Sequence, residues 1–364
     1  MRSSPVPIQS ASESGSLASE SPPAPAAVPT QATPWIVSPR FDLLFLANVW
    51  WLLALTPWFV SGEGTPHVEF WQIYFLTTPH RWITLFLVAT DPDRRGGRSR
   101  IFAVMAVVAL VLVCADLLVT GAFTCLLLVD YVWNAWHFAA QHAGVLRMYS
   151  RKQGGGRPRL ETWCLRIFVF YVIVRLAGWS TGWMEGSASA RQVLHYCDLA
   201  ILILPALLLV LELVQRPWIR PGKLCFLASV CGMYGALLWA VMDDQKRVIL
   251  GLVAASAAFH AVEYLAVVSH YAQRRRTQGT AGLFRSLSRY WTAVLAAYVV
   301  VLGLMANVAD GVVPEFWLGI NLWAAFLHYA FDGMIWKLRK PETAAALGVE
   351  IPRQTSLEPG AAGR

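Results

Sequence analysis

The sequence predicts an all-α fold, namely a polytopic integral membrane bundle of about ten transmembrane helices with both chain termini in the cytoplasm. Of its 364 residues, 56% are hydrophobic and only 14% are charged, whereas about a quarter of the residues of a soluble domain are charged. Long apolar runs recur along the chain, and each could cross a hydrocarbon core of about 30 Å. Basic residues gather in alternate loops between these runs, which is typical of membrane proteins.

The chain divides into three parts by composition. Residues 1–40 are rich in Ser, Pro and Ala, so we expect a disordered cytoplasmic tail, because such a segment cannot bury enough apolar surface to fold. Residues 41–340 hold the apolar runs and form the predicted ten-helix transmembrane domain. Residues 341–364 are expected to be a second disordered cytoplasmic tail. If the source is bacterial, the membrane is the inner, cytoplasmic one.

A helix needs about 20 mostly apolar residues to cross a membrane. The weakest break between two candidate spans is at Thr120 and Gly121, because residues 101–149 form almost one continuous apolar run. The ten candidate spans are 41–60, 70–90, 101–119, 121–148, 161–180, 193–214, 223–242, 247–271, 290–306 and 315–337.

The charges of the loops support this count. With the amino terminus in the cytoplasm, the five inside loops carry 20 Lys and Arg residues, and the outside loops carry only three. A span missed in the middle of the chain would scramble this bias. Because the basic residues lie in short loops and form no stripe on one face, we expect no nucleic-acid partner. The inside loops are 91–100, 147–160, 215–223, 272–289 and 337–340.

Four histidines lie at similar depth in spans that run in the same direction. Spans 2, 4, 8 and 10 run from outside to inside, and their histidines lie about 10 to 16 residues from the outer ends, which is roughly 15 to 24 Å into the membrane. If these helices pack together, the imidazoles converge, and a divalent metal is the usual reason to gather them in a low dielectric. The predicted metal ligands are His80, His137, His260 and His328.

Polar side chains share helix faces with these histidines, although each costs free energy inside a membrane. Asn134 and Gln141 lie on the face of His137, and we expect the two amides to orient that histidine or a water molecule. Asp332 is expected to accept a hydrogen bond from a ligating histidine. The role of Glu263 is open between a ligand and such a hydrogen-bond partner. The candidate catalytic residues are therefore Glu263, Asp332, Asn134 and Gln141.

Other polar residues in the spans have simpler explanations. A single histidine in a membrane helix is more often a packing residue than a ligand. His142 points about 100° away from the polar face, and His270 lies near the cytoplasmic end of its span, so both are weaker ligand candidates. Arg175 lies deep in the fifth span and needs a carboxylate partner, for which Asp116 and Asp130 are the candidates.

The predicted donor set indicates a class of chemistry. Four imidazoles with nearby carboxylates and no thiolates suit non-haem iron, while copper, zinc and manganese stay open. Iron with an open position can activate O₂, and deep apolar surroundings would select a membrane lipid or an isoprenoid as substrate. The predicted function is a metal-dependent oxidoreductase that oxygenates, desaturates or cleaves such a substrate. The identity of an electron donor is open.

Two other classes of membrane protein are compatible with the sequence. Paired histidines also hold haem b in electron carriers, and polar stripes also line the pathways of channels, transporters and non-metal acyltransferases. The chain has no P-loop and no G-x-G-x-x-G motif that opens a helix after a strand. ATP-driven transport and Rossmann-type redox chemistry therefore lack support.

Three short motifs contain three of the four histidines. They are Phe75-Leu-Thr-Thr-Pro-His80, Trp136-His137-Phe138 and Phe259-His260-Ala-Val-Glu-Tyr264. Together they resemble the histidine motifs of the Brp/Blh family of membrane β-carotene 15,15′-dioxygenases. The resemblance implies a polytopic helical protein that binds iron through four histidines, His80, His137 and His260 among them, and cleaves a carotenoid to retinal. Depth and helix face, not the resemblance, make His328 the fourth candidate.

Overall fold

A computed structural model describes residues 33–58, 71–153, 156–182, 186–215 and 221–349. Within these ranges all regular secondary structure is helical. Short helices cap the bundle: α1 (Pro39–Phe41), α3 (Pro92–Arg95), α11 (Leu283–Ser288) and α14 (Pro341–Ala346). The long helices are α2 (Trp71–Thr90), α4 (Ser99–Thr120), α5 (Thr124–Lys152), α6 (Pro158–Thr181), α7 (Ala188–Ile201) with α8 (Ile203–Val214), α9 (Pro221–Met242), α10 (Lys246–Arg275), α12 (Trp291–Val312) and α13 (Pro314–Ile335).

Five of the described helical segments are long and apolar enough to cross a membrane, which indicates a membrane protein. They are Ser99–Thr120, Ala188–Val214, Pro221–Met242, Lys246–Arg275 and Trp291–Val312. Large apolar side chains on α4 and α12 are exposed; Leu118 and Val119 are each 84% exposed and Val312 is 72% exposed. Contiguous apolar surface of this kind marks contact with lipid or with a partner.

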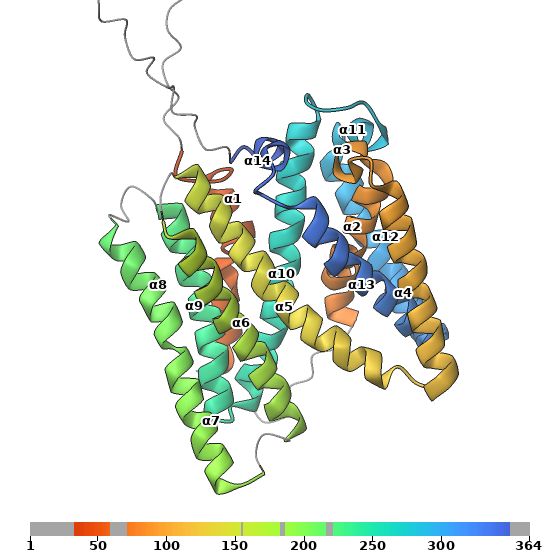
Figure 1. Ribbon diagram of the computed structural model, residues 1–364. Coiled ribbons are helices and arrows are strands. Elements are labelled where there is room, and N and C mark those ends of the chain that lie inside the picture. Colours follow the sequence, from red (N-terminus) through yellow and green to blue (C-terminus); the bar gives the residue numbers. More distant parts are fainter. Residues whose placement is uncertain (1–32, 59–70, 154–155, 183–185, 216–220, 350–364) are drawn as a thin grey trace, which may run out of the picture. The chain divides into compact units, whose positions relative to one another are not determined.

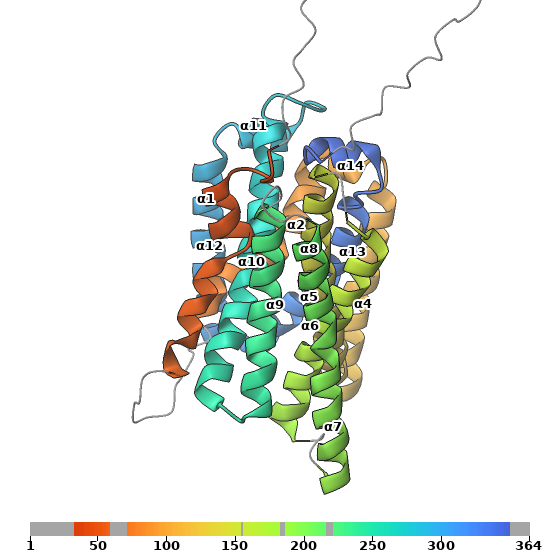
Figure 2. The same cartoon turned by 90° about the vertical axis from the view of Figure 1, so that its left-hand side faces the viewer.

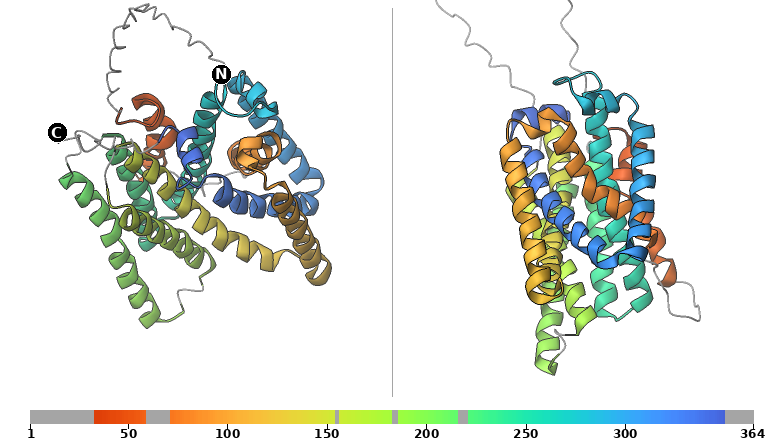
Figure 3. Two further views of the ribbon diagram at one scale, coloured as in Figure 1. Left: turned by 45° about the horizontal axis from the view of Figure 1, so that its top comes forward. Right: turned by 90° about the vertical axis from the view of Figure 1, so that its right-hand side faces the viewer.

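Helix α10 lies at the centre of the described bundle. It packs against α2, α5 and α9, while α13 packs against α2, α4, α5 and α12. In Figure 1, α5 runs obliquely between a group formed by α6, α8 and α9 and a group formed by α2, α4 and α13. Figure 2 shows α9 and α10 side by side, and Figure 3 shows α13 slanting beside α4 and α12. The helices that carry the four candidate ligands are therefore neighbours.

The first predicted span, 41–60, is not a regular α-helix. A π-helical turn (η1, Asp42–Leu46) is followed by a 3₁₀ helix (η2, Val49–Trp58), and residues 59 and 60 lie outside the described ranges. Asn48 separates the two at a positive φ of 46°, a conformation that asparagine tolerates well. Its Nδ2 donates to the carbonyls of Leu46 and of Phe259 on α10. The side chain of Asn48 thus satisfies the carbonyl of Leu46 at the break between the two segments and connects this break to α10.

Two helix breaks follow from single residues. Gly121 has a φ of 68° and ends α4, as expected from the weak break at Thr120 and Gly121, because glycine takes this conformation without strain. The predicted span 193–214 is divided at Leu202 into α7 and α8. Pro205 has no backbone N–H to donate to the carbonyl four residues earlier, and this missing bond explains the division.

Part of each expected tail packs on the bundle. In the first, residues 33–40 pack on the bundle: the Asp42 carboxylate accepts the backbone N–H of Ile36 at 2.6 Å, and Ile36 is 3% exposed. In the second, α14 and residues up to Val349 pack on the bundle, and Val349 is 0% exposed. The rest of the two expected tails 1–40 and 341–364, namely residues 1–32 and 350–364, lies outside the described residues.

The partner of Arg175 differs from the prediction. Its Nε lies 3.2 Å from Oδ2 of Asp198 on α7, and both side chains are buried. The candidates Asp116 and Asp130 are not involved; Asp130 instead accepts a hydrogen bond from the Tyr329 hydroxyl at 3.0 Å. Sequence distance and helix face could not identify Asp198, because the choice depends on how α6 and α7 pack together.

Candidate metal centre

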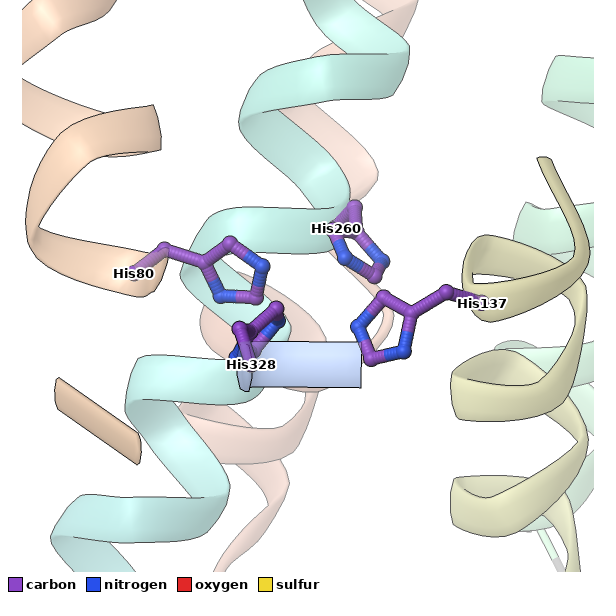
Figure 4. Close-up of side chains that lie close together, drawn as sticks. All are labelled: His80, His137, His260 and His328. Carbon is purple, nitrogen blue, oxygen red and sulfur yellow. The ribbon is translucent and has the colours of Figure 1, made fainter. Parts of the chain in front are cut away.

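Four helices each contribute one histidine to a single buried cluster. His80 comes from α2, His137 from α5, His260 from α10 and His328 from α13, and Figure 4 shows their rings facing one another. Their exposed fractions are 4%, 7%, 1% and 0% in that order. The sequence-predicted set is thus brought together, and we call it the four-histidine cluster.

The cluster has the dimensions of a mononuclear metal site. One ligand nitrogen from each histidine can be chosen so that all four lie within 4.8 Å of one another. Two nitrogens on opposite sides of an ion, each at about 2.1 Å, would lie about 4.2 Å apart, so small side-chain movements would close the set. His80 and His137 face each other across the cluster, with ring centroids 6.3 Å apart. His328 lies between them, 4.4 Å from the ring of His80.

Five ring nitrogens of the four-histidine cluster are buried and lack hydrogen-bond partners in the described residues. They are Nδ1 of His80, Nε2 of His137, both ring nitrogens of His260 and Nε2 of His328. A buried polar atom without a partner costs about 1–3 kcal/mol. A metal ion would satisfy one nitrogen of each of the four rings directly, and the second nitrogen of His260 would stay without a partner among the described residues. This buried four-histidine group could hold a metal ion.

A hydrogen-bond network fixes the ring of His328. Its Nδ1 lies 2.8 Å from the Thr84 hydroxyl, and that hydroxyl donates to Oδ1 of Asp332 at 2.9 Å. The Thr84 oxygen also lies 2.6 Å from the Tyr264 hydroxyl. When the single Thr84 proton goes to the carboxylate, Nδ1 of His328 carries a proton and donates to Thr84, and the lone pair of His328 is on Nε2. Tyr264 also donates to Asp332, and Trp336 donates to Tyr264.

The position of Asp332 is close to the prediction but differs in one step. The sequence predicted a direct hydrogen bond from a ligating histidine to Asp332. In the structure Thr84 stands between His328 and Asp332, and Oδ2 of Asp332 lies 3.9 Å from Nε2 of both His137 and His328. Asp332 therefore acts on the cluster through Thr84.

Each histidine of the cluster is followed four residues later by a polar residue on the same helix face. All four helices run toward the end of the bundle where α3, α11 and α14 lie (Figure 1). The four residues therefore form a second polar layer, displaced from the histidines by roughly 6 Å toward that end. Tyr264 and Thr84 were not among the predicted site residues, and this i+4 spacing was the signal that could have found them. The second layer is Thr84, Gln141, Tyr264 and Asp332.

Gln141 was expected to orient His137 or a water molecule, and its hydrogen bonds among the described residues go to neither. Its Nε2 donates to the carbonyl of His260 at 2.8 Å and to Oε2 of Glu263 at 2.9 Å. Glu263 also pairs with His142, whose Nδ1 lies 2.8 Å from the same oxygen, and both side chains are 0% exposed. His142 and Glu263 thus form a buried pair beside the four-histidine cluster, and the cluster does not include them.

The remaining candidates lie apart from the cluster. Asn134 is half-buried on α5 and makes no hydrogen bond to a cluster histidine among the described residues. His270 approaches the carbonyl of Leu347 with its Nε2 at 3.0 Å, near α14. No structural feature of the described residues assigns Asn134 or His270 to the metal centre. His195, which is not a ligand candidate, is exposed on α7.

A cavity of about 770 Å³ opens beside the cluster. His137, Tyr264 and Asp332 form part of its wall, so the cluster and its second polar layer are accessible from it. Trp133, Trp136 and Tyr329 contribute aromatic surface to the same wall, together with small apolar residues of α5. A cavity of this size accommodates an organic molecule next to the cluster.

Comparisons with protein-family models, with curated proteins and with solved structures find no match for this chain. Its function is therefore argued from the site itself.

Proposed function

We propose that this chain is a multi-pass membrane oxidoreductase that binds one non-haem iron ion through His80, His137, His260 and His328 and acts on a lipid or isoprenoid. The observation that carries the proposal is the buried four-histidine cluster, in which one nitrogen of each histidine lies within 4.8 Å of the others, beside a large cavity. Imidazole ligands without thiolates suit iron better than a structural zinc site. Copper, zinc and manganese also bind imidazoles, and metal analysis distinguishes them.

The proposed topology has ten crossings with both termini in the cytoplasm. The short basic helix α3, together with α11 and α14, lies at one end of the described bundle, whereas the α4–α5 turn and the α12–α13 junction lie at the other (Figure 1). Helices α2, α5 and α13 are not among the five candidate spans, and each carries a histidine of the cluster and a polar residue four positions later. Polar residues of membrane helices commonly face the protein interior in this way.

The proposed roles of the residues around the metal follow from their hydrogen bonds and ring contacts. Bound iron would supply O₂ activation. Thr84 and Asp332 hold the proton of His328 on Nδ1, which leaves Nε2 as a ligand atom. The ring of Phe138 stacks on His260 at a centroid distance of 3.7 Å and fixes its plane. The aromatic wall at Trp133 and Trp136 excludes water from an apolar substrate.

The resemblance to the Brp/Blh family extends this proposal to the cleavage of an isoprenoid chain. It is supported by the meeting of His80, His137 and His260, which belong to its three motifs, in one cluster. Tyr264 occupies the position four residues after His260 and binds Asp332. Carotenoid cleavage by the purified protein, with retinal as product, tests this part separately.

The cluster geometry disfavours a haem-b electron carrier. A haem takes two axial histidines, and its porphyrin fills the plane between them. Here His260 and His328 lie between His80 and His137, with centroids only 4.4 to 5.0 Å from those rings. That space cannot also hold a porphyrin. The purified protein should accordingly show no Soret band.

The metal content of purified variants tests the proposal. The full chain in neutral detergent should contain close to one iron per chain, and the His137→Ala and His328→Ala variants should lose most of it, because each removes one of four ligands. His195→Ala, an exposed histidine outside the cluster, is the matched control and should keep its iron. Retention of iron by both cluster variants, or absence of any transition metal from the wild type, contradicts the proposal.

A further inference from the structure

The cavity beside the cluster has a basic end that metal binding does not explain. Its wall includes five cationic side chains and, apart from Asp332 at the histidine end, no carboxylate. None of the five forms an ion pair with a carboxylate in the described part of the chain, where the ion pairs to Lys and Arg involve other residues. The five, which we call the basic end, are Arg147, Arg151, Arg166, Lys337 and Arg339.

Several of these cations are held in place without a counter-charge. The Nε atoms of Arg151 and Arg166 are buried and have no hydrogen-bond partner among the described residues. Arg166 lies over the ring of Trp136 at 5.4 Å, so this member of the basic end also contacts the aromatic wall. A buried donor without a partner is costly, so an anion at this end would stabilise the arrangement.

The two ends of the cavity differ in chemistry and are separated by a measurable length of α5. His137 lies ten residues before Arg147 and 14 before Arg151, which places the histidine end roughly 15 to 21 Å from the basic end along the helix axis. Between them the wall is formed by small and apolar residues such as Ala140, Gly144 and Val145. An uncharged hydrocarbon would fill the apolar part and leave the guanidinium groups unpaired.

We infer that the cavity binds an amphiphile with an acidic head group and a long apolar chain. The carboxylate or phosphate of the head lies at Arg147 and Arg151, and the chain runs along α5 past His137. Guanidinium groups bind both acids through charge-assisted hydrogen bonds. The basic end is at the predicted cytoplasmic interface, where lipid head groups lie, so the head stays in the interface as the chain enters. The inference rests on the proposed function only in placing the chain beside the metal.

Equilibrium binding of three probes to the full chain in neutral detergent tests the inference. Oleate should bind at least about tenfold more tightly than oleyl alcohol, which has the same chain without the charge. Oleoyl lysophosphatidate distinguishes the source of the anion: tighter binding than oleate identifies a phosphate head group, and weaker binding identifies a free carboxylic acid. Either order supports an acidic amphiphile. Equal binding of oleate and oleyl alcohol overturns the inference.

Charge variants locate the head group. Combined Arg147→Gln and Arg151→Gln should weaken oleate binding by about tenfold or more, because two charge-assisted contacts are lost. Combined Arg147→Lys and Arg151→Lys keeps the charge and should retain most of the binding, which excludes misfolding as the cause. The matched control combines Arg159→Gln and Lys340→Gln, two exposed cations outside the cavity. An equal loss in this control indicates nonspecific attraction and overturns the inference.

The outcome is separable from that of the proposed function. Charge-dependent oleate binding by a chain that contains no metal would leave the inference standing and remove the oxidoreductase proposal. An iron-containing chain that binds oleate and oleyl alcohol equally would overturn the inference and leave the oxidoreductase proposal standing.

Discussion

The hydroxyl of Thr84 lies 2.8 Å from Nδ1 of His328 and connects this histidine to Asp332. A ligating imidazole usually donates its other nitrogen to an acceptor that fixes its orientation. Here the acceptor is a hydroxyl whose own proton is directed to a carboxylate. The tautomer of His328 thus depends on a residue of another helix, α2, which also carries His80.

Removal of the Thr84 hydroxyl should therefore weaken metal binding without removing a ligand. Thr84→Val should lower the affinity for iron by about 10- to 100-fold, the usual cost of losing such a hydrogen-bond partner. Thr84→Ser keeps the hydroxyl and should bind iron almost as the wild type does. Chelator titration of the purified variants measures the difference. Equal affinities of the Val and Ser variants would show that Thr84 does not orient His328.

The His142–Glu263 pair should support the fold and leave metal content unchanged. His142→Leu and Glu263→Leu should each lower the free energy of unfolding by about 3–5 kcal/mol, because each leaves a buried polar partner uncompensated. The double variant should lower the free energy of unfolding by less than the sum of the two single effects. Thermal unfolding in detergent and iron analysis measure both effects. Loss of iron from the Glu263 variant would place its carboxylate in the ligand set instead.

Close packing of α12 on α2 should be sensitive to one glycine. A Cβ at Gly303 would lie 2.2 Å from Cδ1 of Phe75, whereas nothing lies within 4 Å of a Cβ at Gly311 of the same helix. Gly303→Ala should destabilise the fold by about 1–3 kcal/mol, and adding Phe75→Leu should recover part of this loss. Gly311→Ala is the control and should be neutral or slightly stabilising. Equal unfolding temperatures of the Gly303→Ala and Gly311→Ala variants would show that α12 does not approach α2 as described.

The proposed ten-crossing topology predicts which surface positions are accessible from outside the cell. Single cysteines at exposed positions, in a chain without its native cysteines, report this accessibility. Asp243→Cys and Glu315→Cys lie at the predicted outer side, and Gln278→Cys and Lys340→Cys lie at the predicted inner side. A membrane-impermeant maleimide should label the first two in intact cells and the other two only after permeabilisation. Labelling of Gln278→Cys in intact cells would be incompatible with this topology.

Much of the bundle could be predicted from the sequence because membrane helices follow from local composition. The break at Gly121 and the approach of the four histidines were both expected from hydropathy, helix periodicity and depth. The irregular structure of the first span was not expected, because its π-helical and 3₁₀ segments depend on the contact of Asn48 with Phe259 on α10. Such a contact joins residues far apart in sequence and has no local signal.

The second polar layer shows the same limit within the candidate site. Asp332 was expected to act on a ligating histidine, but the intermediate role of Thr84 and the hydrogen bond of Tyr264 depend on how α2, α10 and α13 pack. Gln141 was expected to orient His137 or a water molecule because Gln141 and His137 share a helix face. Its side chain binds Glu263 instead, since helix spacing describes one helix and not its neighbours.

X-ray absorption at the edge of the bound metal tests the central claim most directly, because it reports which atoms surround the ion. Four imidazoles sharing one ion predict a first shell of nitrogen and oxygen at about 2.1 Å, no sulfur, and outer-shell scattering from several imidazole rings. His328→Ala should weaken that outer-shell scattering, and His195→Ala should leave it unchanged. A first shell that contains sulfur, or one without imidazole scattering, would contradict the assignment of this cluster as the metal centre.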